Sequence, residues 1–218
     1  RCFVGLDLSQ VEMRMPAANT GGDVFKFVNN PEVEERKLDP TYDIHACVAA
    51  IVFGPLFLNL DERDPKQYKR KAFLRTICKR VVYGRNYRGE AKTLFANIKK
   101  KTDGVTLKMV ADACLAYDRR FPEVKQFADR EWAAAMACRA LFSPIFGRRR
   151  YFPGDDRMPI PITDASNFRI QSGSADLMNM GMRDTYYALP RKAEIIIEVS
   201  DQVVAECDVA DAGDVEDI

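Results

Sequence analysis

The order of local patterns along the chain is the strongest constraint on its fold. A short apolar run that is typical of a buried strand, residues 3–8, opens the sequence. Two alternating runs that are typical of strands, residues 193–199 and 203–207, come near its end and are joined by a short turn. Nearly everything between them has a helical pattern. The sequence therefore predicts an α+β fold in which a long helical insertion separates the first strand from the last hairpin.

Apolar spacing and helix-capping residues locate the expected helices within the insertion. Ser9 is the expected N-cap of the first helix, which Gly21 and Gly22 end, and Thr163 or Asp164 is the expected cap of the last. We expect a polar, irregular segment over residues 26–42, a loop over 55–65, and a turn with short extended arms over 146–153. The expected helices cover residues 10–18, 43–53, 66–87, 106–119, 122–141 and 163–189.

Composition excludes several classes of protein. Hydrophobic residues make up 47% of the 218 residues and charged residues 30%, which is ordinary for a water-soluble domain. No apolar run approaches the roughly 20 residues that a membrane span needs, so no membrane partner is expected. The six cysteines are scattered without a CxxC pair, which argues against a disulfide scaffold or a zinc site and favours a reducing compartment. We therefore expect a cytoplasmic location.

Charge is distributed unevenly along the chain. Residues 63–101 contain fourteen Lys and Arg against two acidic residues, whereas residues 194–218 contain nine acidic residues and no Lys or Arg. This asymmetry favours a polyanion-binding surface in the middle of the chain and a carboxylate-rich end that binds cations. A solvated basic helix and a frayed acidic end would give the same pattern, and charge alone does not separate the two interpretations.

Two acidic residues follow strand-like runs, Asp7 after the first and Asp201 at the tip of the last hairpin. If the first strand pairs with that hairpin, the two carboxylates lie side by side and repel each other, which favours divalent cations. Mg²⁺ prefers such oxygen ligands together with substrate phosphates. A pair of metal ions about 3.5–4 Å apart stabilises both oxygens of a phosphoryl displacement. The alternative is that each Asp only caps a turn.

A second candidate group repeats every four residues on the basic helix. Arg75, Lys79, Tyr83 and Tyr87 lie on one stripe, with about 6 Å of helix axis between neighbours. Two cations followed by aromatic rings suit a triphosphate followed by a sugar or base. The alternative is a charged, solvated face above a core stripe.

Six blocks of residues, in the same order, resemble motifs of the family A DNA polymerases. The blocks are D-L-S-Q-V-E-M-R (7–14), D-I-H with F-G (43–45, 53–54), R-x3-K-x3-Y-G-x2-Y (75–87), F-G-R-R-R (146–150), N-x2-I-Q-x3-A-D (167–176) and V-S-D-Q (199–202). Together they span nearly the whole chain, although each block alone is weakly specific. The resemblance implies a right-hand polymerase that lacks its thumb, with an antiparallel palm sheet (residues 1–20 and 162–218) and helical fingers (residues 21–161).

The resemblance also implies a role for each matching residue. Two Mg²⁺ ions are expected at the Asp7 and Asp201 carboxylates and the Leu8 carbonyl, and Asp7, Asp201 and Lys79 are the expected catalytic residues. Glu12 is expected to exclude a sugar 2′-hydroxyl. The residues expected to contact the deoxynucleoside triphosphate are Gln10, Glu12, His45, Arg75, Lys79 and Tyr83. The residues expected to contact primer–template DNA are Arg14, Tyr87, Asn167, Gln171 and Ser200.

Several features depart from the family pattern or stay open. Ser200 and Gln202 stand where the family has His and Glu, which removes an imidazole and one negative charge next to Asp201. Tyr83, where other members have Phe, resembles some bacteriophage and mitochondrial members and favours a viral origin. His45 also suits a purely structural role, and the three arginines at 148–150 suit either internal ion pairs or DNA contact. We expect the thumb, and in some parents an exonuclease domain, to lie in the rest of a longer polymerase chain.

Three functions remain to be separated. The first is template-directed DNA synthesis by two-metal phosphoryl transfer. The second is a catalytically impaired relative that only binds nucleic acid, which the changes at Ser200 and Gln202 favour. It is opposed by the retention of five site residues, Asp7, Asp201, Arg75, Lys79 and Tyr83. The third is a single-subunit RNA polymerase, which suits the basic helix but not Gln10 and Glu12.

Overall fold

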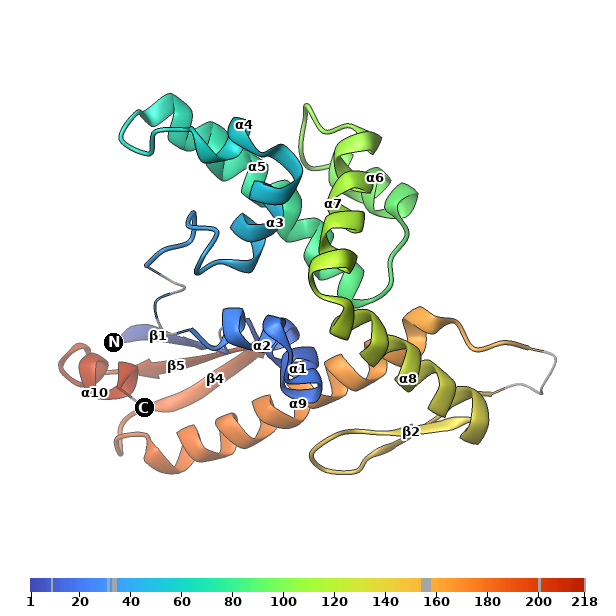
Figure 1. Cartoon of the computed structure of the whole chain (residues 1–218). Coiled ribbons are helices and arrows are strands. Elements are labelled where there is room, and N and C mark those ends of the chain that lie inside the picture. The colour runs from blue at the N-terminus through green and yellow to red at the C-terminus, as the bar shows by residue number, and fades with distance from the viewer. Residues whose placement is uncertain (9, 31, 33–34, 154–157, 200, 218) are drawn as a thin grey trace.

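The computed structural model describes residues 1–8, 10–30, 32, 35–153, 158–199 and 201–217. Its main sheet has three antiparallel strands in the order β1-β5-β4, so the first strand pairs with the last hairpin, as the sequence predicted (Figure 1). The strands are β1 (Cys2–Asp7), β4 (Glu194–Val199) and β5 (Gln202–Cys207). The fold class is therefore α+β, with the helices inserted between β1 and β4.

The register of β1 on β5 is fixed along the whole length of both strands. Cys2 faces Cys207 at one end of the pair, with 3.6 Å between the two Sγ atoms, and Asp7 faces Gln202 at the other. One face of β5 is buried through Val203, Ala205 and Cys207, which alternate with less buried positions as the period of a half-buried strand requires.

A short C-terminal segment covers this buried face. Ala205 and Cys207 pack with Val4 of β1 and with Val215 of α10 (Ala212–Glu216), which follows the 3₁₀ turn η2 (Val209–Asp211). Both ends of the described chain lie at this end of the sheet (Figure 1). The sheet thus has its own small core, separate from the cores of the helical part.

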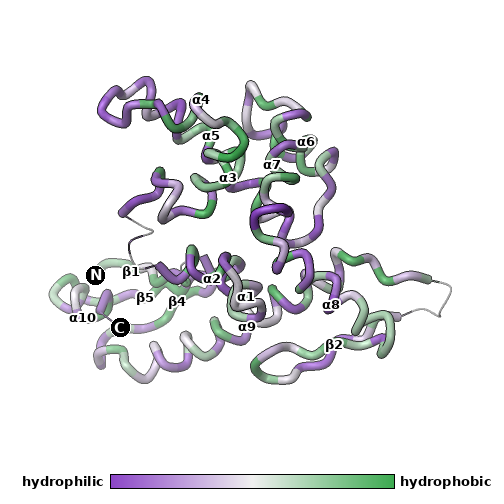
Figure 2. The backbone as a smooth tube through the Cα atoms, viewed as in Figure 1, coloured by the Kyte–Doolittle hydropathy of each residue, from purple (hydrophilic) through white to green (hydrophobic). Residues whose placement is uncertain are grey.

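The helical insertion has a large core of its own, built mainly by α3, α5 and α7. Buried positions such as Val48 of α3, Ile77 and Val81 of α5, and Tyr117 of α7 meet there. α3 is apolar nearly throughout, whereas α5 begins with a strongly hydrophilic segment (Figure 2). The helices of this part are α2 (Asp23–Val28), α3 (Ile44–Phe53), α4 (Pro55–Leu58), α5 (Pro65–Asn86), α6 (Ala91–Lys99), α7 (Leu107–Arg120) and α8 (Pro122–Cys138).

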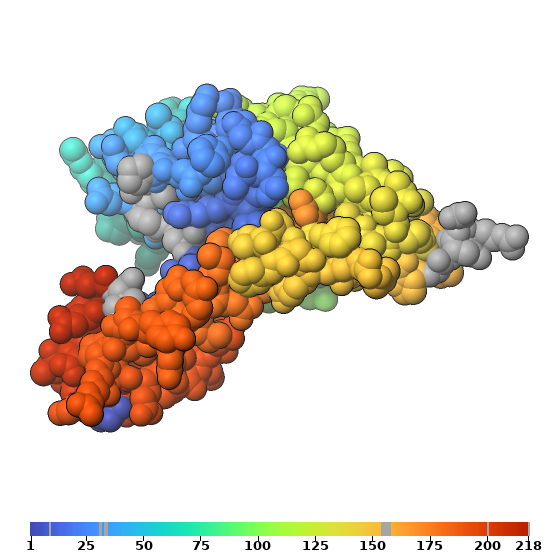
Figure 3. Space-filling model, turned by 90° about the horizontal axis from the view of Figure 1, so that it is seen from below, coloured from blue at the N-terminus to red at the C-terminus, as the bar shows by residue number. Residues whose placement is uncertain are grey.

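Two helices connect the helical insertion with the sheet. α1 (Val11–Thr20) follows β1 directly and α9 (Ile162–Ala188) leads into β4. They pack on each other and on α8 through Val11, Met15, Phe127 and Ile170, all of them buried. Seen from below, α9 forms a long surface band between the C-terminal segment and the hairpin that follows α8 (Figure 3). These two helices therefore fix where the sheet stands relative to α5.

The hairpin of β2 (Ala140–Phe142) and β3 (Arg149–Tyr151) is tied to α9 by a buried carboxylate. Asp176 is fully buried, accepts a hydrogen bond from the Phe146 backbone N at 3.1 Å, and forms an ion pair with Arg148. Arg148 therefore has a structural partner, although it is exposed, as are Arg149 and Arg150. Among the described residues, no helix is both long and apolar enough to cross a membrane.

Several expected boundaries are wrong. Residues 23–28 form α2 where an irregular segment was expected to begin, and residues 55–58 form the short helix α4 within the expected loop. α6 and α10 were not expected at all, and α8 ends three residues early, at Cys138, where Arg139 takes a left-handed conformation with φ of 52°. The expected N-cap Ser9 lies outside the described residues; Gln10, also left-handed, precedes α1. Neither expected cap of α9 is right, because the helix begins at Ile162, after Pro161.

Candidate active site

Asp7 and Asp201 stand at the same end of the paired strands. Asp7 is the last residue of β1, and the next backbone N–H, that of Leu8, donates a 2.9 Å hydrogen bond to the carbonyl oxygen of Asp201. This bond continues the β1–β5 ladder by one step beyond the Asp7–Gln202 pair. The pairing that would bring the two residues side by side is therefore present.

The donor set at this end of the sheet fits a hard divalent cation. Neither Asp7 nor Asp201 forms an ion pair with a Lys or Arg among the described residues, so no cation of the protein neutralises them there. The Leu8 carbonyl accepts only a long 3.4 Å hydrogen bond, from Val11 N. Two carboxylates and a carbonyl are oxygen ligands of the kind that Mg²⁺ binds. Within the described part of the chain, no group of three His, Cys, Asp or Glu side chains gathers as a metal site, so substrate or water oxygens would have to complete the coordination.

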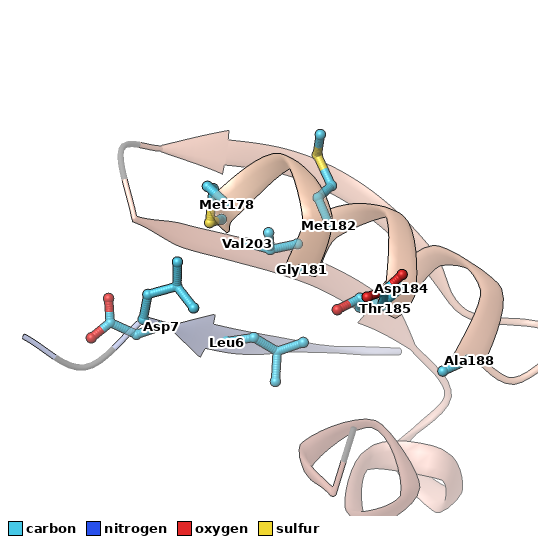
Figure 4. A pocket seen from close by; sticks show the side chains of 10 residues that line it. Leu6, Asp7, Met178, Gly181, Met182, Asp184, Thr185, Ala188 and Val203 are labelled. Atoms are coloured by element: carbon cyan, nitrogen blue, oxygen red, sulfur yellow. The ribbon is translucent and has the colours of Figure 1, made fainter. Parts of the chain in front are cut away.

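A pocket of about 420 Å³ lies beside the strand end, between the sheet and α9 (Figure 4). Leu6 and Val203 form its sheet side, Met178 and Met182 its helix side, and Asp7 stands at one end. The side chain of Asp7 extends beyond the end of β1 rather than toward α9. The pocket is mostly apolar, so it does not extend the polar site, and phosphate groups would gain nothing inside it.

The stripe on α5 lies within electrostatic range of the two strand ends. Burial first, and then the carboxylates of Glu12 and Asp201, raise the pKa of Tyr83 to about 12, while Arg75 opposes them. The Lys79 ammonium is 5.8 Å from the centre of the Tyr83 ring and is exposed. The structure thus brings α5, α1 and the Asp201 turn together around Tyr83. The sequence pattern alone did not predict that these three segments lie close together.

His45 is almost completely buried on α3, against the same tyrosine. The two ring centres are 5.7 Å apart, and the His45 Nδ1 atom has no hydrogen-bond partner among the described residues. Burial, followed by the positive charges of Arg75 and Lys79, lowers the pKa of His45 well below its ordinary value of 6.5. The imidazole is therefore neutral at pH 7, and its unsatisfied nitrogen does not fit the purely structural role of a core histidine with satisfied hydrogen bonds.

Asp43 is a site residue that the sequence analysis missed. Its carboxylate accepts a 2.7 Å hydrogen bond from Ala46 N, which caps α3, and forms a 2.5 Å ion pair with Arg75. The side chains of Asp43 and Arg75 are only 3% and 15% exposed. The capping pattern D-I-H was visible in the sequence, but the partner on α5 was not. Arg75 keeps further N–H donors, and its Nε is buried without a partner.

The three candidates on α1 or just before it differ in burial and in their neighbours. Glu12 is half-buried and lies close enough to Tyr87, just after α5, to raise the pKa of that phenol in addition to the larger effect of burial. Gln10 stands at the start of the helix with φ of 53°, and its carbonyl accepts hydrogen bonds from the next turn. Arg14 is exposed. Glu12 thus joins the group around Tyr83, whereas nothing places Arg14 in that group.

The two candidates on α9 lie in the first half of the helix, whereas the pocket beside Asp7 is lined by residues of its second half. Asn167 and Gln171 are four residues apart and share a face. Asn167 is half-buried with an unpaired Oδ1, and Gln171 is exposed. Ser200, the remaining DNA-binding candidate, lies outside the described residues. Gln202 is described: a Cβ built on Gly5 would stand 2.8 Å from its Nε2, so the side chain leans along β1 over Gly5, two residues before Asp7.

Comparisons with known proteins find similarity along nearly the whole chain. The model of the family described as "DNA polymerase family A" matches residues 1–218. DNA polymerase I of Chloroflexus aurantiacus is 26% identical over 211 residues, which is 94% of this chain and 20% of the relative. DNA polymerase I of Treponema pallidum is 25% identical over 184 residues, 81% of this chain and 17% of the relative. The chain thus spans about a fifth of the length of these curated relatives.

A solved structure shares the fold. The polymerase domain of Pol1 from M. smegmatis, in complex with a DNA primer-template and a dNTP, superposes with a TM-score of 0.64. The match covers 99% of this chain and 35% of the other, at 22% sequence identity. These similarities are to bacterial proteins, and the viral origin that Tyr83 favours stays a prediction.

Proposed function

The chain belongs to DNA polymerase family A, and from that membership we propose that it forms the palm and fingers of an enzyme that extends a DNA primer on a template. Residues 1–20 and 162–218 form the palm in this proposal, and residues 21–161 form the fingers. The substrates are primer–template DNA and deoxynucleoside triphosphates, and the rest of the polymerase chain, including a thumb, supplies further grip on the duplex. The expected location is the cytoplasm of a bacterium or of a phage-infected host.

One observation carries the proposal. The hydrogen bond from Leu8 N to the Asp201 carbonyl joins two strand ends that each bear a carboxylate, within electrostatic range of Tyr83 on the cationic stripe of α5. A negative site beside a positive one suits a reaction that needs metal ions at the reacting phosphate and cations at the leaving phosphates. The proposed reaction is attack of the primer 3′-hydroxyl oxygen on the α-phosphorus of the nucleotide. The bond between the α-phosphorus and the oxygen that links it to the β-phosphate breaks, and pyrophosphate leaves.

The protein's contribution is mostly charge placement. Asp7, Asp201 and the Leu8 carbonyl would hold two Mg²⁺ ions, which when bound supply charge stabilisation to the attacking and leaving oxygens. Arg75, held by Asp43 on one side, presents its remaining N–H groups to the triphosphate, and the exposed Lys79 adds a mobile positive charge.

Neutral His45 and the sugar-side residues complete the nucleotide site. With a low pKa, His45 donates or accepts one hydrogen bond without adding a third charge next to Arg75 and Lys79. Tyr83 packs against the sugar, with Gln10 nearby, and Glu12 occupies the space that a 2′-hydroxyl would need. Tyr87, Arg14, Asn167, Gln171 and Ser200 are assigned to the template and primer strands.

The alternative, a nucleic-acid-binding relative with impaired catalysis, is favoured by Gln202. Its amide lies over Gly5 instead of extending beyond the strand end with Asp7, and it carries no charge. In this alternative the chain binds primer–template normally and extends it slowly even with abundant Mg²⁺. The alternative and the main proposal make different predictions for extension but the same prediction for DNA binding.

Primer extension by the full-length protein tests the proposal. We expect Asp7→Ala and Asp201→Ala each to reduce the extension rate by orders of magnitude, with duplex affinity retained. Asp208→Ala is the matched control, because Asp208 follows the other end of β5 and pairs only with Lys192 at 3.7 Å. Near-normal extension by either site variant would refute the metal assignment. Equal rates with ribonucleotides and deoxynucleotides would instead indicate an RNA polymerase.

A further inference from the structure

A second pocket, of about 680 Å³, opens between α5 and α6. Its apolar floor is formed by Leu94 and Ile98 of α6. Its walls carry five positively charged side chains and no acidic one among the described lining residues. The lining side chains with polar groups are Arg75, Thr76, Lys79, Arg80, Tyr83, Asn97, Lys100 and Lys101.

Of these five cations, only Arg75 pairs with a carboxylate among the described residues, that of Asp43, and the other four are not neutralised there. Lys79, Lys100 and Lys101 are exposed, and none of them pairs with a carboxylate in the part of the chain that the structure describes. Arg80 is held from the side by a hydrogen bond to the Thr102 hydroxyl, which fixes its guanidinium without cancelling its charge. By contrast, Lys108 and Lys125 on the neighbouring helices each pair with an aspartate one turn away. Uncompensated positive charge around a concave surface attracts and concentrates anions.

The pocket is broader than the stripe already assigned to the nucleotide. Arg75, Lys79 and Tyr83 form one edge of it, but Arg80 stands about 100° further around α5 than Lys79. Asn97, Lys100 and Lys101 come from another helix or from the residues that follow it. His45, which contacts Tyr83, does not line the pocket. The α6 side of the pocket therefore supplies a second set of cations that can bind a phosphate group held by Lys79.

We propose that Arg80, Lys100 and Lys101 form a polyphosphate subsite that takes pyrophosphate as it leaves the proposed reaction centre. This inference rests on the proposed function, because that reaction produces pyrophosphate beside Lys79. Pyrophosphate is compact and carries several charges, so it matches several cations on a concave surface of this size. The same chemistry is present in the triphosphate tail of an incoming nucleotide. A DNA duplex is too wide to enter a pocket between two adjacent helices and would touch only its rim.

Binding of sodium pyrophosphate to the full-length protein, followed by isothermal titration calorimetry at low salt, tests the subsite. The variant Lys100→Gln with Lys101→Gln should bind pyrophosphate about tenfold more weakly, because two charge-assisted contacts are lost. The matched control, Lys92→Gln with Lys99→Gln, removes the same charge from α6 outside the pocket and should change affinity less than twofold. All four lysines are exposed, so unchanged melting temperatures should show that both double variants fold.

Further ligands separate the possible sources of the phosphate. Deoxyadenosine monophosphate should bind both double variants equally. If dATP also weakens about tenfold in the pocket variant, the subsite serves the triphosphate tail too; if only pyrophosphate weakens, it serves the product alone. Both results support a polyphosphate subsite. Unchanged pyrophosphate affinity in the pocket variant, or a loss confined to a single-stranded oligonucleotide, overturns it.

The inference and the proposed function fail in different assays. Primer extension by the unsubstituted protein tests the function, and pyrophosphate calorimetry tests the subsite without DNA. A protein that extends primers but binds pyrophosphate equally in all variants keeps its function and loses the subsite. A protein that extends no primer but shows the tenfold difference has the subsite without the reaction.

Discussion

Replacing Asp43 by alanine should destabilise the fold by about 3 kcal/mol, which can be worked out from two separate contacts. Loss of an N-cap side chain costs about 1 kcal/mol, and Asp43 caps α3 through its 2.7 Å bond to Ala46 N. Removing one partner of a buried ion pair costs roughly 3–5 kcal/mol. Because the Arg75 side chain is still 15% exposed and can turn toward the pocket, we take about 2 kcal/mol as the cost of losing the ion pair.

Three further variants separate these contributions. Asp43→Asn keeps a good capping side chain but removes the charge, so it should cost about 2 kcal/mol. Thr106→Ala removes only a cap, that of α7, where the Thr106 hydroxyl accepts from Met109 N at 3.2 Å, and should cost about 1 kcal/mol. Adding Arg75→Gln to Asp43→Asn should cost little more, since the buried charge without a partner is then gone.

Urea denaturation followed by circular dichroism measures all four, with an unchanged dependence on urea as the check that the unfolding reaction is the same. If Asp43→Ala costs no more than Thr106→Ala, the Arg75 ion pair adds nothing to stability. If Asp43→Asn costs as much as Asp43→Ala, the cap adds nothing. Either outcome would refute the division of the lost unfolding free energy into one contribution from the cap and one from the ion pair. A steep rise in the KM for nucleotide in Asp43→Asn would further show that the pair orients Arg75.

Three other predictions concern single residues. His45 is the only histidine, and its folded pKa lies well below 6.5, so below about pH 6.5 the unfolded state binds a proton that the folded state does not. Stability should therefore fall as pH drops below 6.5, by up to about 1.4 kcal/mol per pH unit, and urea titrations at several pH values should show a flatter dependence in His45→Gln. Glu12→Ala should increase ribonucleotide incorporation in primer-extension assays, and an unchanged deoxy/ribo ratio would place the selection elsewhere. Gly84→Ala should lower thermal stability by about 1–3 kcal/mol because its Cβ would collide with Leu94, whereas Gly181→Ala, with nothing within 4 Å, should be neutral or slightly stabilising.

The sequence predicted those parts of the fold that local patterns determine. The first strand, the last hairpin and the long helices α5 and α9 were recognised from their residue patterns, and their pairing and order are confirmed. The short helix α2 was missed because its stability is not local. Its six residues bury Val24 and Val28, and the Val24 N–H donates to the Glu123 carboxylate of α8 at 2.9 Å. No pattern within residues 23–28 shows that partner.

The candidate site was predictable in its residue types but not in its contacts. Spacing placed Arg75, Lys79 and Tyr83 on one stripe, and the structure keeps them so. The pairing of Arg75 with Asp43 depends on how α3 packs on α5, and the charged wall of Lys100 and Lys101 depends on α6, a helix that the sequence analysis missed although its apolar residues Leu94 and Ile98 have helical spacing. The roles in catalysis and in substrate binding stay predictions until the variants are measured.

Because the candidate site at Asp7 and Asp201 needs the pairing of β1 with β5, it can form only late in synthesis. The facing thiols of Cys2 and Cys207 are 205 positions apart, so a ribosome must deliver the whole helical insertion before the strand that completes the ladder emerges. Until then β1 lacks its β5 partner, and its unpaired backbone N–H and C=O groups can bind another extended chain. The helices depend on nearer contacts and can pack first. Pulse-labelling of nascent chains should therefore find a protected α5 before β1 is protected, and no Mg²⁺-dependent change until translation has passed residue 207.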